Sequence, residues 1–462
     1  MAVRERVVLA FLSAAVVATF GLGGAVAYSF GHGVGTIPTT SFLTPSTGAA
    51  ATGTDPAAGT TAPAPAPGAP PPGTAGHAAA AAPGAASPVV PRAAAAVAAA
   101  APGGVAPGGT ITVGGIYEES GPVDATPGRD AVRAYFNEVN AAGGVNGHTL
   151  RLVDCDSAFD PTRGHQCSER LANSGILAMV GWLSPSSEQA EAGYLTQRGI
   201  PTFGGLGVPA EFQSPLSYPV GVNLMHAVEG FSTHAAELGI RAPALVIINT
   251  PFTSPAGKAF TDSLHRHGIH EKSLDFVDAT KPDYTDLAVK IRLEGADSIM
   301  AGLDPFSYAR LFQALDRQNF HPPFMGVGLD KPSAERQYGT AVYGAESAAP
   351  FLEPDEHADV PAMREYHDAM QRYFPAEMHD LDTYSEGAWI SAKVFVAALR
   401  RIGTAPVTPR ALVEAANGLT NFETGLTTPL TFGPGAHDAN HCLQWIRNQQ
   451  GTWHTYSGWN CF

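Results

Sequence analysis

The residues best placed for chemistry lie in the stretch 176–207, where polar side chains and glycines follow two apolar runs. Ser184, Ser186 and Ser187 come just after the first run, 176–180, and just before a helical pattern. At a strand-to-helix turn, free backbone N–H groups and the positive end of the helix dipole favour an anion such as a carboxylate. The alternative is that these serines only cap the helix, which any β/α protein requires.

A second turn follows the apolar segment 200–203 and is rich in glycine, with Gly204, Gly205 and Gly207 around Leu206. Glycines let a ligand approach bare backbone closely. Because parallel strands end at one edge of a sheet, the two turns predict a crevice for a small molecule. A dinucleotide site is not favoured, since the third glycine of that motif is missing.

Alternating strand and helix patterns must position these turns. Strands are predicted at residues 110–118, 148–154, 176–180 and 200–203, and then at 218–223, 244–249, 273–277, 298–303, 324–327 and 343–351. Helical patterns separate most of them, and this repeat is typical of doubly wound parallel sheets. The predicted fold class is α/β, with two doubly wound parallel-sheet lobes.

The last part of the chain is predicted to be mainly helical, at 360–374, 384–401 and 409–417, with late strands at 430–432 and 441–447. These segments are too few to form a domain alone, so they must pack back on the two lobes. The chain is therefore expected to cross between the lobes more than twice.

The N-terminal region predicts export. Arg4 and Arg6 precede an uncharged apolar stretch, 7–27, which ends in small residues. Residues 1–27 are typical of a signal peptide cleaved before Tyr28, or of an uncleaved membrane anchor. The following residues, 28–107, are rich in Ala, Pro and Gly and predict a disordered linker. The chain would then be secreted or tethered at the cell surface.

Four cysteines, Cys155, Cys167, Cys442 and Cys461, suit two disulfides in an exported protein. Three pairings are possible, and we favour the local pairs, Cys155 with Cys167 and Cys442 with Cys461. Their spacing does not match a zinc or thioredoxin-like motif.

The net charge of −15, without a basic stripe, argues against nucleic acid as a partner. Catalysis is not predicted, because the Gly-x-Ser-x-Gly and His-Glu-x-x-His motifs are absent from the sequence. His265, His267 and His270 form a small cluster that can take a metal, but a solvated helix end is the favoured interpretation, so no metal site is predicted.

The run 114–147 contains a Ser-Gly-Pro turn, a helix and an Asn-x-x-Gly-Gly-x-x-Gly ending. It resembles the start of type I periplasmic binding proteins, in the leucine/isoleucine/valine-binding group of ABC-transporter substrate-binding proteins. Similar stretches continue to the closing segment 443–453, so the resemblance covers about residues 108–462. It implies a receptor that closes on a small polar ligand, an amino acid or related compound, and delivers it to an ABC-type permease, with no cofactor.

The resemblance also implies two lobes joined by three crossovers. Lobe 1 is expected at 108–225 and 352–430, and lobe 2 at 226–351 and 431–462. Hinge crossings are expected near 223–225, 351–354 and 431–434.

In the family, serines after the third strand and a small-residue turn after the fourth hold the ligand's carboxylate. The matching positions are Ser184, Ser186 and Ser187, and the turn from Gly204 and Gly205 to Val208. Val208 stands where amino-acid binders have threonine, and Gly328 stands where they have an acid for the ligand's ammonium. Asp330, or Asp304 at another strand end, is the candidate replacement for that acid.

Four further candidates for the ligand site are Tyr117, Ser120, Trp182 and Tyr384. Tyr117 and Trp182 lie at strand ends, Ser120 lies in the turn after the first strand, and Tyr384 opens a long helix. Aromatic residues in such places also serve as core. A competing function is an extracellular ligand-sensing module that acts through a signalling partner.

Overall fold

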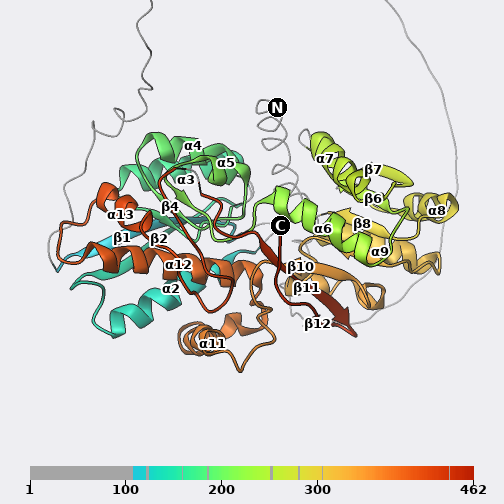
Figure 1. Ribbon diagram of the computed structural model, residues 1–462. Helices are drawn as coiled ribbons and strands as arrows, with labels where there is room; N and C mark the ends of the chain where they lie inside the picture. The colour runs from blue at the N-terminus through green and yellow to red at the C-terminus, as the bar shows by residue number, and fades with distance from the viewer. Residues whose placement is uncertain are drawn as a thin grey trace, which may run out of the picture. The chain divides into compact units, whose positions relative to one another are not determined.

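The computed structural model describes residues 108–120, 124–158, 160–184, 187–249, 253–278, 281–303, 305–435 and 437–462 (Figure 1). The predictions for residues 1–27 and 28–107, and those for Ser186 and Asp304, fall outside these ranges. Within them, no helix combines the length and apolar composition needed to cross a membrane.

The first sheet is fully parallel, with strand order β2-β1-β3-β4-β5. Its strands are β1 (Thr110–Tyr117), β2 (Thr149–Asp156), β3 (Met179–Val180), β4 (Thr202–Phe203) and β5 (Ser217–Tyr218). The order reverses between β1 and β3, so the sheet is doubly wound, and the turns after β3 and β4 leave the same edge.

Helices from two separate parts of the chain accompany this sheet. They are α2 (Thr126–Ala141), α3 (Pro161–Asn173), α4 (Glu188–Gln197) and α5 (Pro209–Gln213), and later α11 (Pro361–Tyr373), the 3-10 helix η4 (Pro375–His379), α12 (Thr383–Ile402) and α13 (Pro409–Ala416). α12 packs on α2 and touches β3 and β4. It begins at Asp382, whose carboxylate accepts the Ser385 N–H at 2.8 Å, and Trp389 meets Tyr135 edge-on in the core.

The second sheet has strand order β12-β11-β10-β9-β8-β6-β7. Its strands are β6 (Ala244–Ile248), β7 (Ser273–Val277), β8 (Ile299–Gly302), β9 (Phe324–Gly326), β10 (Glu346–Ala349), β11 (Cys442–Gln449) and β12 (Thr452–Thr455), and β13 (Asn460–Cys461) pairs with β11. Strands β6 to β10 are parallel, whereas β11 pairs antiparallel with both β10 and β12. Its helices are α6 (Leu224–Glu237), α7 (Thr253–Arg266), α8 (Thr285–Glu294), α9 (Pro305–Arg317), α10 (Pro332–Glu335) and the 3-10 helix η3 (Gly339–Val342).

The predicted α/β class with two doubly wound sheets is confirmed. The strand predicted at residues 430–432 is wrong, because Leu430 makes only an isolated bridge to Phe422. Leu430 and Phe432 are instead buried in the core beside the first sheet. Their apolar pattern therefore reflects burial in the core and not membership of a strand. The strand predicted at 343–351 is limited to β10.

The chain passes between the two sheets three times, after β5, after β10 and before β11. Asn440 lies at these passages and is fully buried. Its side-chain amide lies 3.1 Å from the Val220 carbonyl oxygen, 3.3 Å from that of Pro350 and 3.1 Å from the Thr427 hydroxyl. One side chain thus joins segments from all three passages.

Candidate ligand-binding site

A cavity of about 870 Å³, including its open mouth, is lined by residues that follow strands of both sheets. The lining comes from the ends of β3, β4, β9 and β10, from the starts of α6 and α12, and from β11: Leu183, Gly205, Leu206, Gly207, Gly221, Val222, Ala227, Phe231, Val327, Gly328, Asp330, Ala348, Pro350, Phe351, Thr383, Tyr384, Gly387 and Leu443. A concave, mainly apolar pocket with a few polar groups is typical of small-molecule sites.

The wall of this cavity is mostly apolar. Only Asp330, Thr383 and Tyr384 among its lining residues carry polar side chains. A ligand that fills it must therefore present mainly nonpolar surface, with polar groups directed at these few positions.

Asp330 lies just after β9 and is 7% exposed. Its carboxylate accepts a hydrogen bond from the Thr383 hydroxyl at 3.2 Å. Burial, with a smaller contribution from the nearby Asp382, raises the pKa of Asp330 to about 6. The raised pKa means that burial destabilises the charged carboxylate. A ligand group that donates hydrogen bonds or carries positive charge would stabilise it.

The next residue, Lys331, forms a buried ion pair with Asp382, with Nζ 2.8 Å from Oδ2. Together with Asp330 and Thr383, this pair links the turn after β9 to the first turn of α12. Both charges of the pair also line a smaller neighbouring cavity of about 360 Å³, which shares Leu183, Leu206 and Tyr384 with the larger one.

The turn after β4 is filled by the protein's own carboxylates. The Leu206 N–H donates to Glu188 at 3.2 Å, and the N–H groups of Gly207 and Val208 donate to Glu211 at 3.2 and 3.1 Å. The predicted carboxylate-binding turn therefore has three of its donors engaged internally.

Glu188 and Glu211 are both buried. Burial raises the pKa of Glu211 to about 7. Burial and the adjacent Glu211 also raise the pKa of Glu188 well above its usual range. Two acids in contact with raised pKa values share a proton near neutral pH.

Two of the predicted serines, Ser184 and Ser187, lie outside the lining of both cavities. Ser184 Oγ lies 3.0 Å from Glu118 Oε1, 3.0 Å from Ser157 Oγ and 2.6 Å from Ser187 Oγ. Ser184 and Ser187 are 0% and 2% exposed, and neither lines either cavity. Leu183, the residue before them, lines both, so a role for the two serines as direct ligand contacts has no support in the cavity geometry.

Four other candidates also lie outside the lining of both cavities. Tyr117 is fully buried and donates from its hydroxyl to the Val180 carbonyl at 3.2 Å, and Trp182 belongs to a buried cluster. Gly204 packs so closely on Ser391 of α12 that a Cβ would lie 1.8 Å from its hydroxyl. Ser120 donates to Asp156. The core interpretation fits both aromatic residues.

Among the predicted residues, Gly205, Asp330 and Tyr384 line the larger cavity. The apolar wall of this cavity, including Leu206, Phe231 and Phe351, was not predicted from the sequence. Leu206 stands between two glycines in the sequence, but only the orientation of the turn decides whether its side chain lines the cavity.

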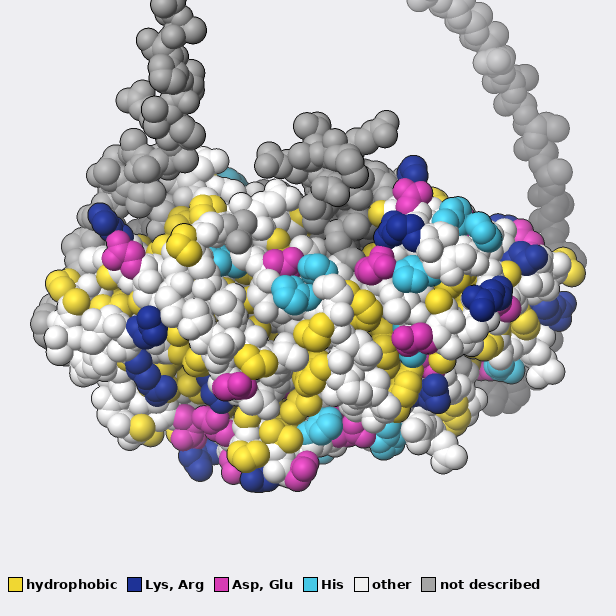
Figure 2. Space-filling model, in the orientation of Figure 1, with side chains coloured by type: hydrophobic (Ala, Val, Ile, Leu, Met, Phe, Trp, Pro, Cys, Tyr) yellow, Lys and Arg dark blue, Asp and Glu magenta, His cyan; other side chains and the backbone are white. Residues whose placement is uncertain are grey.

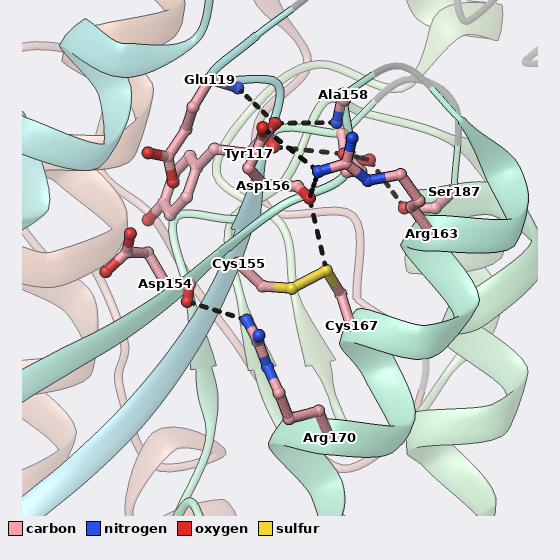
Figure 3. Close-up of a disulfide and its surroundings, with 12 residues drawn as sticks. Tyr117, Glu119, Asp154, Cys155, Asp156, Ala158, Arg163, Cys167, Arg170 and Ser187 are labelled. Carbon is pink, nitrogen blue, oxygen red and sulfur yellow. Dashed lines mark hydrogen bonds and ion pairs between the residues drawn. A yellow bond between two sulfur atoms is a disulfide. The ribbon is translucent and has the colours of Figure 1, made fainter.

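Both favoured disulfides are present, Cys155 with Cys167 and Cys442 with Cys461. Figure 3 shows the first joining β2 to α3, where Arg163 and Arg170 of the helix donate to the backbone carbonyls of Asp156 and Asp154. The disulfide thus fixes the end of β2. The Asp156 carboxylate at that end accepts N–H groups of Glu119 and Ala158 and orders the loop after β1.

The histidines at the end of α7 point to different acids. His265 lies 2.8 Å from Glu271, and His267 lies 2.7 Å from Glu229. They form surface pairs at the helix end, which agrees with the favoured interpretation of that cluster.

A family model described as periplasmic binding protein matches residues 110–452. The Leu/Ile/Val/Thr-binding protein of Salmonella typhimurium is 22% identical over 51% of this chain and 64% of its own length. An amino acid binding protein of Pseudomonas aeruginosa is 25% identical over 49% of this chain and 64% of its length. The chain thus spans slightly less than two thirds of these curated relatives.

Solved structures match more of the chain. A fatty acid ABC transporter substrate-binding protein from Thermomonospora curvata has a TM-score of 0.67 at 19% identity, covering 78% of this chain and 95% of that one. A branched chain amino acid ABC transporter structure from Thermus thermophilus with bound valine also scores 0.67, at 16% identity, covering 77% and 97%. At these identities the likeness establishes the fold.

Proposed function

We propose that this chain, which belongs to the periplasmic binding protein family, is an extracytoplasmic solute receptor that closes on a small molecule and delivers it to an ABC-type permease. The observation that carries the proposal is the cavity, which is built from the strand ends of both sheets and is mostly apolar. Relatives that carry names for amino acid or fatty acid binding support a small solute as the ligand. The N-terminal segment would export the chain or tether it.

The ligand that fits best is a compound related to the branched amino acids, with an apolar body and an amine or amide group. The apolar body would fill the wall near Phe231 and Phe351, and the polar group would donate to Asp330. A free α-carboxylate fits less well, because the N–H groups of Leu206, Gly207 and Val208 already bind Glu188 and Glu211.

Closure would use contacts that already bridge the two parts of the site. Asp330 and Lys331 follow β9 of the second sheet, whereas Thr383 and Asp382 begin α12, which packs beside the first sheet. A ligand between them favours the closed arrangement only by its difference in affinity for the closed and open states.

A thermal-shift panel tests the ligand class. The panel contains branched amino acids, their amides and decarboxylated amines, and short carboxylates. A ligand at about 100 times its Kd adds about 2.7 kcal/mol to stability, and we expect the amines and amides to raise Tm by a few degrees. A rise in Tm with carboxylates alone would contradict the proposed ligand class but still support a receptor function. No rise in Tm with any compound would count against a receptor for these solutes.

Two variants then locate the site. Asp330→Asn should weaken the binding of a cationic ligand about 10- to 100-fold, since hydrogen bonds to a charged group contribute roughly 1.5–3 kcal/mol. Ala227→Trp should abolish binding of any ligand by filling the cavity. Asp286→Asn, at an exposed acid paired with Lys281, is the control. Affinities unchanged by both cavity variants would place the site elsewhere.

A further inference from the structure

Two histidines and an aspartate come together where the chain passes between the sheets. His226 lies in the first turn of α6, and Asp438 and His441 lie just before β11. His226 Nε2 is 3.0 Å from Asp438 Oδ2, and His441 Nδ1 is 3.9 Å from Asp438 Oδ1. One donor atom from each residue lies within 4.8 Å of the others, and no other such trio occurs in the described ranges.

The backbone on both sides of this trio is held in place. Val222 forms a bridge with Asn440, which is itself anchored to three segments by its buried amide. The Cys442–Cys461 disulfide fixes the residue after His441. The trio therefore sits on fixed backbone, although His226 is more than 200 residues from Asp438 and His441 in sequence.

The side chains themselves are oriented toward one another. The two imidazole rings meet edge-on with centroids 5.2 Å apart, and Asn223 donates to Asp438 Oδ2 at 3.3 Å. Such an outer-shell hydrogen bond orients a ligating carboxylate. The side chains of His226, Asp438 and His441 are 31%, 35% and 46% exposed, so an ion can reach them from solvent. Figure 2 shows histidine beside acidic side chains at the surface near the start of α6.

We propose that His226, Asp438 and His441 form a binding site for a divalent transition metal of the zinc class. Two imidazole nitrogens and one carboxylate oxygen suit Zn²⁺, which holds such donors at about 2.0–2.2 Å and leaves one tetrahedral position for water. Donors at that length are roughly 3.4 Å apart, so small side-chain rotations from the present arrangement complete the site. Bound metal would tie the start of α6 to the segment before β11.

The experiment is calorimetric titration with ZnCl₂ of the full chain. The protein is made without a histidine tag, and a chelator removes any bound metal beforehand. We expect one ion per chain and a rise of a few degrees in Tm. His226→Ala, His441→Ala and Asp438→Asn should each weaken binding about 100-fold or more. Asn223→Ala should weaken it about 10-fold, as an outer-shell partner does.

Matched controls separate this site from ordinary surface histidines. His265→Ala and His321→Ala each remove a histidine that pairs with a single acid, and both should keep the wild-type Kd. Tm of every variant in EDTA checks folding, and millimolar Mg²⁺ should not compete. The absence of saturable one-to-one binding, or a wild-type Kd in all three ligand variants, would overturn the proposal and leave a surface ion pair.

Discussion

The two turns that face the cavity satisfy their polar groups in opposite ways. In the turn after β4, Leu206, Gly207 and Val208 donate to carboxylates of the same side of the molecule. In the turn after β9, Asp330 and Lys331 reach across to the first turn of α12. The first turn offers a ligand mainly glycine surface and the Leu206 side chain, whereas the second offers charge.

This difference indicates where specificity and closure reside. A turn whose donors are internally satisfied keeps its shape with or without a ligand. A turn whose charged groups bind partners across the cavity is stabilised only while the two sides of the cavity stay close together. Changes in the second turn should therefore have larger effects on stability and binding than changes in the first.

The largest expected effect comes from Lys331→Met. This change leaves the Asp382 carboxylate, 3% exposed, without its cation. Breaking a buried pair in this way costs about 3–5 kcal/mol of unfolding free energy. Lys281→Met, which breaks an exposed pair with Asp286, should cost less than about 1 kcal/mol. Equal costs for the two changes in urea denaturation would mean that the cross-cavity pair is not needed to hold the fold.

A pH effect of intermediate size comes from the first turn. Because burial raises the pKa of Glu211 from 4.5 to about 7, the folded chain keeps a proton that the unfolded chain has lost. The unfolding free energy should therefore fall as pH rises from about 4.5 to about 7, by about 3 kcal/mol from this group. Glu211→Gln removes this fall, so its stability relative to wild type should grow between pH 5 and pH 8.

The control for this comparison is Glu414→Gln, at an exposed residue paired with Arg410. Its stability relative to wild type should not change over the same pH range. Buried acids other than Glu188, whose pKa depends on Glu211, contribute equally to all three proteins and cancel in the difference. A Glu211→Gln curve parallel to that of wild type would show that the two carboxyls do not share a proton.

The smallest effect concerns the shape of the first turn. Gly205 has φ +137°, and a Cβ there would lie 2.1 Å from Glu188 Oε1. Gly205→Ala should cost about 1–3 kcal/mol through strain, and displace that carboxylate as well. Gly143 also has positive φ, +102°, but open space around it. The excess cost of Gly205→Ala over Gly143→Ala measures the contact alone, and no excess would mean that the carboxylate moves freely.

Much of the fold was predictable because its signals are local. The helix α3 begins and ends as predicted, since Pro161 suits a first helical position and Asp160 caps the N–H groups of Thr162 and Arg163. The strand β7 also matches its predicted bounds. The strands β3 and β4 are shorter than their apolar runs, which include further buried residues before each strand.

The site was less predictable because its partners are distant in sequence. Ser184 has the residue type and position of an anion ligand, but Glu118 and Ser157 at the ends of neighbouring strands engage its hydroxyl. Asp330 was found because it follows a strand at the predicted edge. His226 carries no local signal for its meeting with His441, since only the crossing of two passages brings them together.

Asn440 sets a mechanical condition on any opening of the molecule. Its amide is held at once by Val220, Pro350 and Thr427, on three separate stretches of chain. A rotation about a distant axis would stretch at least one of these hydrogen bonds, whereas a rotation about an axis through Asn440 stretches none of them. A single amide thereby fixes one point through which the axis of any such rotation must pass.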